Sequence, residues 1–160
     1  MARRKLVIMG AEMFHLNFRG LERGKNRAGD RNFSVYINPD DAEAMANDGW
    51  NVKYQINKTD PNDQKPFIDV AVSYRYIPPK IYIRNDGAQN ETLLDEESIG
   101  VIDTAEIVSA DVRINPRFWK NDSGETRIKA YLDELHVIIY FDEMDAKYRV
   151  LGEDDPPFDV

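Results

Sequence analysis

The sequence predicts a mainly β protein: a small barrel of the OB type with one or two short helices and an acidic, disordered C-terminal tail. Apolar and polar residues alternate in several runs that are separated by glycine, proline and asparagine turns, as in half-buried strands. Helical features are confined to residues 39–48 and 94–102. A long strand, two further strands, a helix and a closing hairpin follow the chain order of an OB barrel. A jelly roll or another β-sandwich is the structural alternative.

The first half of the chain contains three predicted strands and a helix. Residues 5–18 form the first strand, in which Gly10 indicates a bulge or a sharp bend. Residues 32–37 form the second, with Phe33, Val35 and Ile37 on one face. A helix then begins at Pro39, which suits the first helical position, and ends at the glycine of position 49. Residues 50–55 alternate again as a third strand.

The second half contains the remaining strands. Residues 67–74 place Ile68, Val70 and Val72 on one face, and residues 80–84 continue as a strand after a diproline break. Residues 94–102 are predicted to form a short acidic helix. Residues 107–116 and 126–141 are strands, and the second is the longest strand pattern of the chain.

Composition and charge limit the classes of function. The chain has 160 residues, about one domain, and a net charge of -8 at pH 7. It contains no cysteine, which excludes disulfides, thiol catalysis and zinc–thiolate sites. No apolar run approaches the ~20 residues of a transmembrane helix, so no membrane association is expected and a cytoplasmic location is the default. Residues 1–37 carry a positive excess, whereas the C-terminal residues are acidic.

A basic loop joins the first two strands. Its cations are Arg19, Arg23, Lys25, Arg27 and Arg31, opposed only by Glu22 and Asp30. Such a local reversal in an acidic chain indicates a polyanion-binding surface. A solvated hairpin loop is the alternative interpretation.

Aromatic residues are interleaved with cations elsewhere in the chain. The candidate DNA-binding residues outside the loop are Trp50, Lys53, Tyr54, Lys80, Tyr82 and Trp119. Bases of single-stranded nucleic acid stack on aromatic rings, and nearby cations follow the phosphates. Each of these aromatics, taken singly, is more often a core or cross-strand residue. The hypothesis rests on their repeated pairing with cations together with the basic loop.

The sequence offers little support for catalysis. His15 and His136 lie on alternating strands, and neither has a partner at metal-ligand spacing. No phosphate-binding glycine loop and no nucleophile elbow is present. The acidic run 95–97 could hold magnesium, but acids at a helix start usually answer the helix dipole. We therefore expect no enzyme activity, no metal and no cofactor.

The C-terminal residues 149–160 are predicted to form a flexible acidic tail, because acids and prolines bury too little apolar surface to pack. The run Asp154, Asp155, Pro156, Pro157 and Phe158 resembles the acidic tip of bacterial single-stranded DNA-binding proteins. That tip docks replication and repair enzymes and ends on its phenylalanine, whereas Asp159 and Val160 follow here. The resemblance implies that this tail binds replication or recombination proteins.

The body of the chain, residues 14–141, resembles phage-encoded single-stranded DNA-binding proteins of the OB-fold class. The resemblance lies in residues 26–33, 49–54, 78–81 and 115–119. It implies a domain over residues 1–148 that binds and protects single-stranded DNA in phage replication, recombination or repair, in the host cytoplasm. The protein could pair as a homodimer. The alternatives are a phage structural β-sandwich protein without a nucleic-acid role and, more distantly, a magnesium-dependent nuclease.

Overall fold

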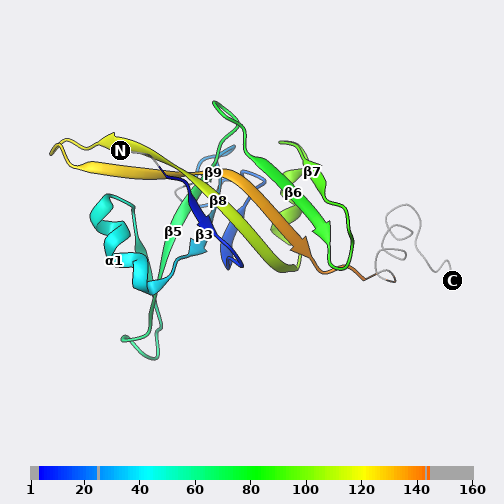
Figure 1. Ribbon diagram of the computed structural model, residues 1–160, viewed down its shortest axis with the longest axis horizontal. Coiled ribbons are helices and arrows are strands. Elements are labelled where there is room, and N and C mark those ends of the chain that lie inside the picture. The colour runs from blue at the N-terminus through cyan, green and yellow to red at the C-terminus, as the bar shows by residue number, and fades with distance from the viewer. Residues whose placement is uncertain (1–3, 25, 143, 145–160) are drawn as a thin grey trace.

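The computed structural model describes residues 4–24, 26–142 and 144, which form one nine-stranded sheet, one α-helix and one 3₁₀-helix (Figure 1). In chain order these are β1 (Leu6–Ile8), β2 (Met13–Asn17), β3 (Arg31–Tyr36), α1 (Pro39–Asp48), β4 (Lys53–Ile56), β5 (Gln64–Val72), β6 (Lys80–Asn85), β7 (Thr92–Leu94), η1 (Ile99–Thr104), β8 (Ile107–Lys120) and β9 (Thr126–Ile139). The prediction of a mainly β protein with one or two short helices is confirmed.

The sheet follows the order β1-β8-β9-β5-β3-β2, with β4 paired to β5 and β6 paired to both β7 and β9. Most pairs are antiparallel, but β9 runs parallel to β5 and to β6. The two ends of this path, β1 and β2, are consecutive parts of the predicted first strand. Gly10, at φ 60°, lies between them, and the Ala11 N–H donates to the Ala110 carbonyl at 2.7 Å. The predicted bend at Gly10 is confirmed.

The core lies between the inward faces of these strands. Phe33, Val35 and Ile37 are buried, as are Ile68, Val70 and Val72, so both predicted faces are confirmed. Asn17 is an exception to the expected alternation, since its side chain is 4% exposed. It is buried because its amide bonds both the N–H and the carbonyl of Leu21, each at 2.9 Å.

Helix α1 begins and ends as the sequence predicts. The Asn38 side chain accepts from the Asp40 N–H at 3.0 Å, which caps the first turn. Gly49 ends the helix at φ 112°. A Cβ at Gly49 would lie 2.6 Å from the Thr126 carbonyl oxygen, so only glycine lets the end of α1 approach β9 this closely.

The prediction of a helix over residues 94–102 is wrong. Residues 92–94 form β7 because they pair with β6, and Asp95 then forms a turn by accepting from Ser98. Only the 3₁₀-helix η1 follows, in which Ile99 and Ile102 are buried. Local hydrogen bonds of the Asx type compete with helix formation here. The third predicted strand is also shorter than expected, since β4 begins at Lys53.

A β-bulge at Asp133 divides β9. Arg113 pairs with Glu134 and Ile114 with Leu132, so Asp133 is the extra residue of β9. Its carboxylate accepts from Lys5 Nζ at 3.1 Å, Arg113 Nε at 2.6 Å and Asn115 Nδ2 at 3.0 Å. Burial alone would raise the pKa of Asp133, but these donors outweigh it and lower the pKa below its ordinary value.

Asp133→Asn should lower the free energy of unfolding by about 1–3 kcal/mol at pH 7, because the variant cannot form these charge-assisted hydrogen bonds. A lowered folded-state pKa contributes stability above the unfolded pKa and loses it as the pH falls through the folded value. The difference between Asp133→Asn and the unsubstituted protein should therefore shrink below about pH 4. Urea unfolding at pH 7 and pH 3 measures it, with Asp122→Asn in the hairpin turn as control. Equal stability of both variants at pH 7 would contradict the role of the bulge.

His136 links β9 to β6 and to Glu91, which precedes β7. Its ring stacks on Tyr82 of β6, with centroids 4.8 Å apart and planes at 9°. Its two nitrogens lie 2.5 Å from a Glu91 oxygen and 2.7 Å from a Glu134 oxygen. Burial would lower the pKa of His136, but the bonds to Glu134 and Glu91 outweigh it and raise the pKa.

Stability should consequently fall as the pH rises from about 6 to 8, because a raised histidine pKa contributes stability below the unfolded value, ~6.5, and loses it as the pH passes the folded value. His136→Gln should flatten this pH dependence in thermal unfolding. The cations Arg113 and Lys80 also act on Glu134, the partner of His136. His15→Gln removes the other histidine and serves as control; the proposal is wrong if it flattens the profile as much as His136→Gln.

Candidate functional site

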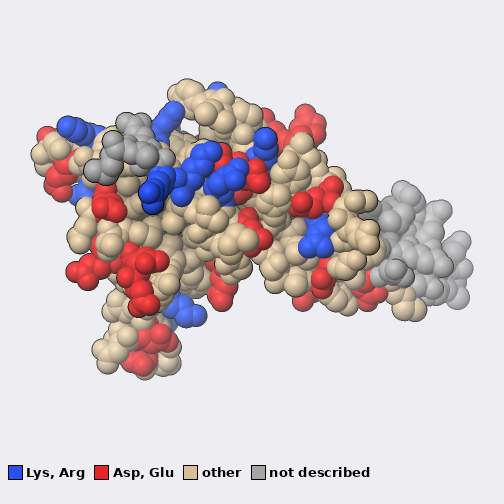
Figure 2. Space-filling model, in the orientation of Figure 1, with Lys and Arg blue, Asp and Glu red and all other residues tan. Residues whose placement is uncertain are grey.

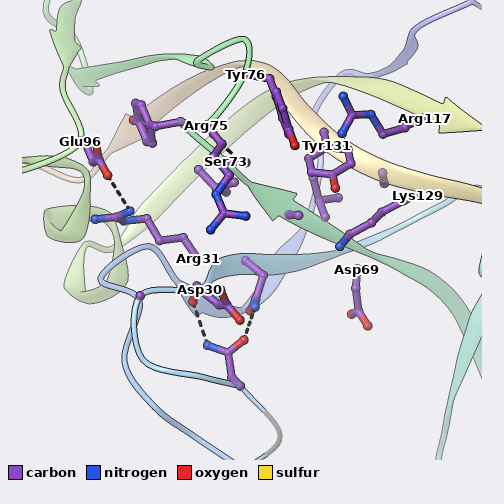
Figure 3. Close-up of a pocket in the computed structure, with 18 residues that line it drawn as sticks. Asp30, Arg31, Asp69, Ser73, Arg75, Tyr76, Glu96, Arg117, Lys129 and Tyr131 are labelled. Carbon is purple, nitrogen blue, oxygen red and sulfur yellow. Dashed lines mark hydrogen bonds and ion pairs between the residues drawn. The ribbon is translucent and has the colours of Figure 1, made fainter.

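A groove of about 800 Å³ crosses the outward face of β3, β5 and β9 (Figure 3). The loop before β3 and the segment that follows β5 form its other walls. Its cations are Arg31, Arg75, Arg117 and Lys129, its aromatic residues are Tyr74, Tyr76 and Tyr131, and its carboxylates are Asp30, Asp69 and Glu96. Cations and aromatic rings in one open groove are the two kinds of group that bind phosphates and bases.

Arg117 lies between two tyrosines in this groove. Its Cζ is 4.7 Å from the centre of the Tyr76 ring and 5.3 Å from that of the Tyr131 ring. Lys129 Nζ lies 5.3 Å from the Tyr131 ring as well. The arrangement follows from strand register, because Arg117 is paired with Lys129, and Asn115 with Tyr131, on the outward face of the β8–β9 hairpin. Tyr76 is 68% exposed and presents its ring to solvent.

Arg31 is held more tightly than the other cations of the groove. Its Nε donates to the Phe18 carbonyl at 3.0 Å, and its NH1 pairs with Glu96 at 3.1 Å. Tyr74 lies beneath the guanidinium, with Cζ 5.9 Å from its ring centre. Among the residues described, no partner is found for the buried Tyr74 hydroxyl. Burial raises the pKa of Tyr74, so this hydroxyl stays a neutral donor.

The basic loop is organised by asparagines. Asn26 Nδ2 donates to the carbonyls of Leu21, at 3.1 Å, and Asp30, at 2.8 Å, and Asn32 Nδ2 bonds the Asn26 side chain at 2.5 Å. Arg19, Arg23 and Arg27 are exposed. Lys25 lies outside the described residues. Of the predicted loop cations that the structure describes, only Arg31 lines the groove, although Asn26, Gly29 and Asp30 of the same loop also line it.

The predicted residues near α1 lie beside the groove. Lys53 of β4 pairs with Asp69 at 2.6 Å, and Tyr54 is exposed on the same strand. Trp50 is half-buried and packs against the core. Trp119 is 51% exposed near the tip of the hairpin. These residues share one end of the molecule with the groove but do not line it.

Lys80 and Tyr82 are in a different place. Both belong to β6, which pairs with the part of β9 that follows the bulge, and neither lines the groove. Tyr82 is stacked on His136. The structure therefore separates these two residues from the remaining candidates.

Sequence reasoning missed six cations and aromatic residues of the groove. The candidates did not include Tyr74, Arg75, Tyr76, Arg117, Lys129 or Tyr131. A signal exists, because Arg127, Lys129 and Tyr131 alternate with the buried Ile128, Ala130 and Leu132 along the longest strand. The outward positions of that strand could have been selected as a cationic and aromatic row.

Positive and negative side chains gather on different parts of the surface. Figure 2 shows Lys and Arg gathered in a band over β8 and β9, and Asp and Glu gathered near α1 and the loop between β4 and β5.

Within residues 4–24, 26–142 and 144, no cluster of His, Asp or Glu could hold a metal ion. Asp95 is instead bonded to Ser98, whose hydrogen bonds lower the pKa of Asp95. No helix in this part of the chain is long and apolar enough to cross a membrane. The tail residues 154–158 lie outside the described residues.

The chain is similar to phage proteins both in family and in fold. The family model "Putative phage ssDNA-binding domain" matches residues 1–158. The single-stranded DNA-binding protein of bacteriophage Enc34 in complex with ssDNA has 13% sequence identity and a TM-score of 0.51, over 87% of this chain and 88% of that chain. The C-terminal truncation of the Enc34 protein has 14% identity and a TM-score of 0.49, over 87% of each chain. A search of curated proteins found no match. The mainly β fold is shared with the Enc34 protein.

Proposed function

Because the chain belongs to the family of phage single-stranded DNA (ssDNA)-binding domains, we propose that it binds ssDNA without sequence preference along the groove. Binding would protect the strand during phage replication, recombination or repair. The role requires no catalysis, metal or cofactor. The observation that carries the proposal is the row of Tyr76, Arg117 and Tyr131 in an open groove.

The position of the groove supports the proposal, because an OB barrel binds oligonucleotides there. We assign β1 with β2, then β3, β5, β8 and β9, as the five barrel strands. The ends of the sheet path, β1 and β2, are halves of one bent segment, which would close the barrel. OB barrels use the face of their second and third strands together with the loops that follow the first and fourth strands. Here residues of β3, β5 and the basic loop line the groove, together with Arg117, Lys129 and Tyr131 from the two strands that the β8–β9 turn connects.

The chemistry of the groove suits a strand of any sequence. Tyr76 and Tyr131 offer aromatic rings, and every base has a face that can stack. Arg75, Arg117 and Lys129 have no ion-pair partner among the described residues, so they can neutralise phosphates without first losing a carboxylate. The Enc34 protein, which shares the fold, was solved with ssDNA, and we extend that class of ligand to this chain.

Arg75→Ala and Arg117→Ala should each flatten the salt dependence of oligo(dT) binding. For single-stranded DNA, the slope of log affinity against log salt changes by ~0.7 for each phosphate that the protein no longer neutralises. Fluorescence anisotropy of a labelled oligonucleotide at several salt concentrations measures this slope. Lys58→Ala, which removes a cation from the exposed loop between β4 and β5, should leave it unchanged. A slope that stays the same in both groove variants would refute the assignment of the groove.

We further propose that residues 1–148 form the DNA-binding domain and that residues 149–160 serve as an acidic tail. A tethered anion meets a basic groove at an effective concentration of the order of millimolar, so the tail would compete weakly with DNA. Phe158, by its resemblance to the bacterial tip, would bind replication or recombination proteins.

Deleting residues 153–160 should therefore tighten oligo(dT) binding, most clearly at low salt, because salt screens the competition. Phe158→Ala should leave DNA affinity unchanged and abolish the pull-down of replication or recombination proteins. Anisotropy and affinity capture measure the two effects separately, and Phe141→Ala, outside the tail, is the control. Unchanged affinity after the deletion and full capture by Phe158→Ala would reduce the tail to a solubilising end.

A further inference from the structure

A second cavity, of about 640 Å³, opens at one end of the groove. Asp69, Lys129 and Ala130 line both hollows, so the two adjoin at these residues. Figure 3 shows Asp69 and Lys129 together at that end of the groove. The cavity arises because β9 pairs with β5 at Ala71↔Tyr131 and next with the segment after α1 at Trp50↔Ile128. Between these two pairings, β5 and β9 separate.

Two tryptophans line this cavity from different elements. Trp50 comes from the segment after α1 and packs against the core, while Trp119 comes from β8 and is 51% exposed. Trp50 is fixed in place because the preceding Gly49 approaches β9 closely. The Gly49 carbonyl accepts from the Ile128 N–H at 2.8 Å. The indole of Trp50 is thus a preformed wall, and a ligand that binds against it incurs no cost of ordering that side chain.

The charges around the cavity suit an anionic ligand. Lys129 and Arg127 line it; Arg127, the strand partner of Trp119, pairs with Glu125 at 3.3 Å, whereas Lys129 has no ion-pair partner among the described residues. Asp69 is the one carboxylate among the described lining residues, and it is already occupied. It accepts from Lys53 Nζ at 2.6 Å and from the Ser34 hydroxyl at 2.6 Å. A phosphate bound at Lys129 would therefore lie beside the Asp69 carboxylate, whose oxygens already accept hydrogen bonds from Lys53 and Ser34.

We propose, resting on the function proposed above, that this cavity is a nucleotide subsite that lengthens the DNA path beyond the groove. A strand that leaves the groove past Lys129 enters the cavity, where a base stacks on Trp119 and contacts Trp50. Lys129 and Arg127 follow the phosphates on either side of that base. The bound strand then runs from Tyr76 and Arg117, through the groove, to the hairpin tip and the end of α1.

The length of the oligonucleotide separates the subsite from the groove. We take oligo(dT) of about four and about twelve nucleotides, because an OB fold covers ~4–16 nucleotides. Trp119→Ala should weaken binding of the longer oligonucleotide by about five- to a hundredfold, the effect of removing one stacked base, and leave the shorter one almost unchanged. Trp119→Phe, which keeps an aromatic ring, should retain most of the affinity. Tyr140→Ala, at 52% exposure and outside the cavity, is the matched control.

Tryptophan fluorescence provides the second readout, because the chain has two tryptophans. Trp50→Phe leaves Trp119 as the only reporter, and Trp119→Phe leaves Trp50. The longer oligonucleotide should quench both reporters, and the shorter one should bind with little quenching of either. Normal affinity of Trp119→Ala for the longer strand, with neither reporter quenched, overturns the subsite while the salt dependence of Arg117→Ala still tests the groove. If no oligonucleotide binds the unsubstituted protein at low salt, the proposed function itself fails.

Discussion

The bulge at Asp133 is the constraint on which the rest of the sheet depends. Before it, Ile128, Ala130 and Leu132 face the core, and after it Leu135 and Val137 do. Strand side chains alternate with a period of two, so a continuous strand could not bury both sets. The one extra residue, Asp133, shifts the alternation so that the apolar residues on both sides of the bulge face the core. Because Asp133 is charged and its side chain is only 13% exposed, it requires the donors that Lys5, Arg113 and Asn115 supply.

The same bulge divides β9 into two parts with different neighbours. The residues before it pair with β5 and place Lys129 and Tyr131 outward in the groove. The residues after it pair in parallel with β6, where the outward His136 is committed to Glu91, Glu134 and Tyr82. One long strand therefore carries a surface that can accept a ligand and a surface whose polar groups are already satisfied. This division explains why Lys80 and Tyr82, although surrounded by the expected residue types, do not line the groove.

The sequence was sufficient where a local rule determines the structure. The Asn38 cap, the glycine end of α1, the bend at Gly10 and the inward faces of β3 and β5 each depend on a few neighbouring residues. It was insufficient where the outcome depends on a distant partner. Residues 92–94 became a strand because β6 lies beside them, and Arg31 became an ion-pair member because Glu96 is brought to it from a distant part of the chain. Charge alternation along β8 and β9 was visible, but the register that brings Arg117 between two tyrosines depends on the hairpin and on the segment after β5.

The acidic character of the chain and its cationic groove are compatible because the groove contains both signs. Arg31 is fixed by Glu96 and the Phe18 carbonyl, and Asp69 is fixed by Lys53 and Ser34, so the paired charges shape the walls. Arg75, Arg117 and Lys129 have no such partner among the described residues, so their positive charge is not offset by a paired carboxylate. Among the described residues, the Tyr74 hydroxyl is the one buried side-chain polar atom without a hydrogen-bond partner. The paired charges therefore fix the shape of the groove, and the exposed Arg75, Arg117 and Lys129 give it positive charge at its surface.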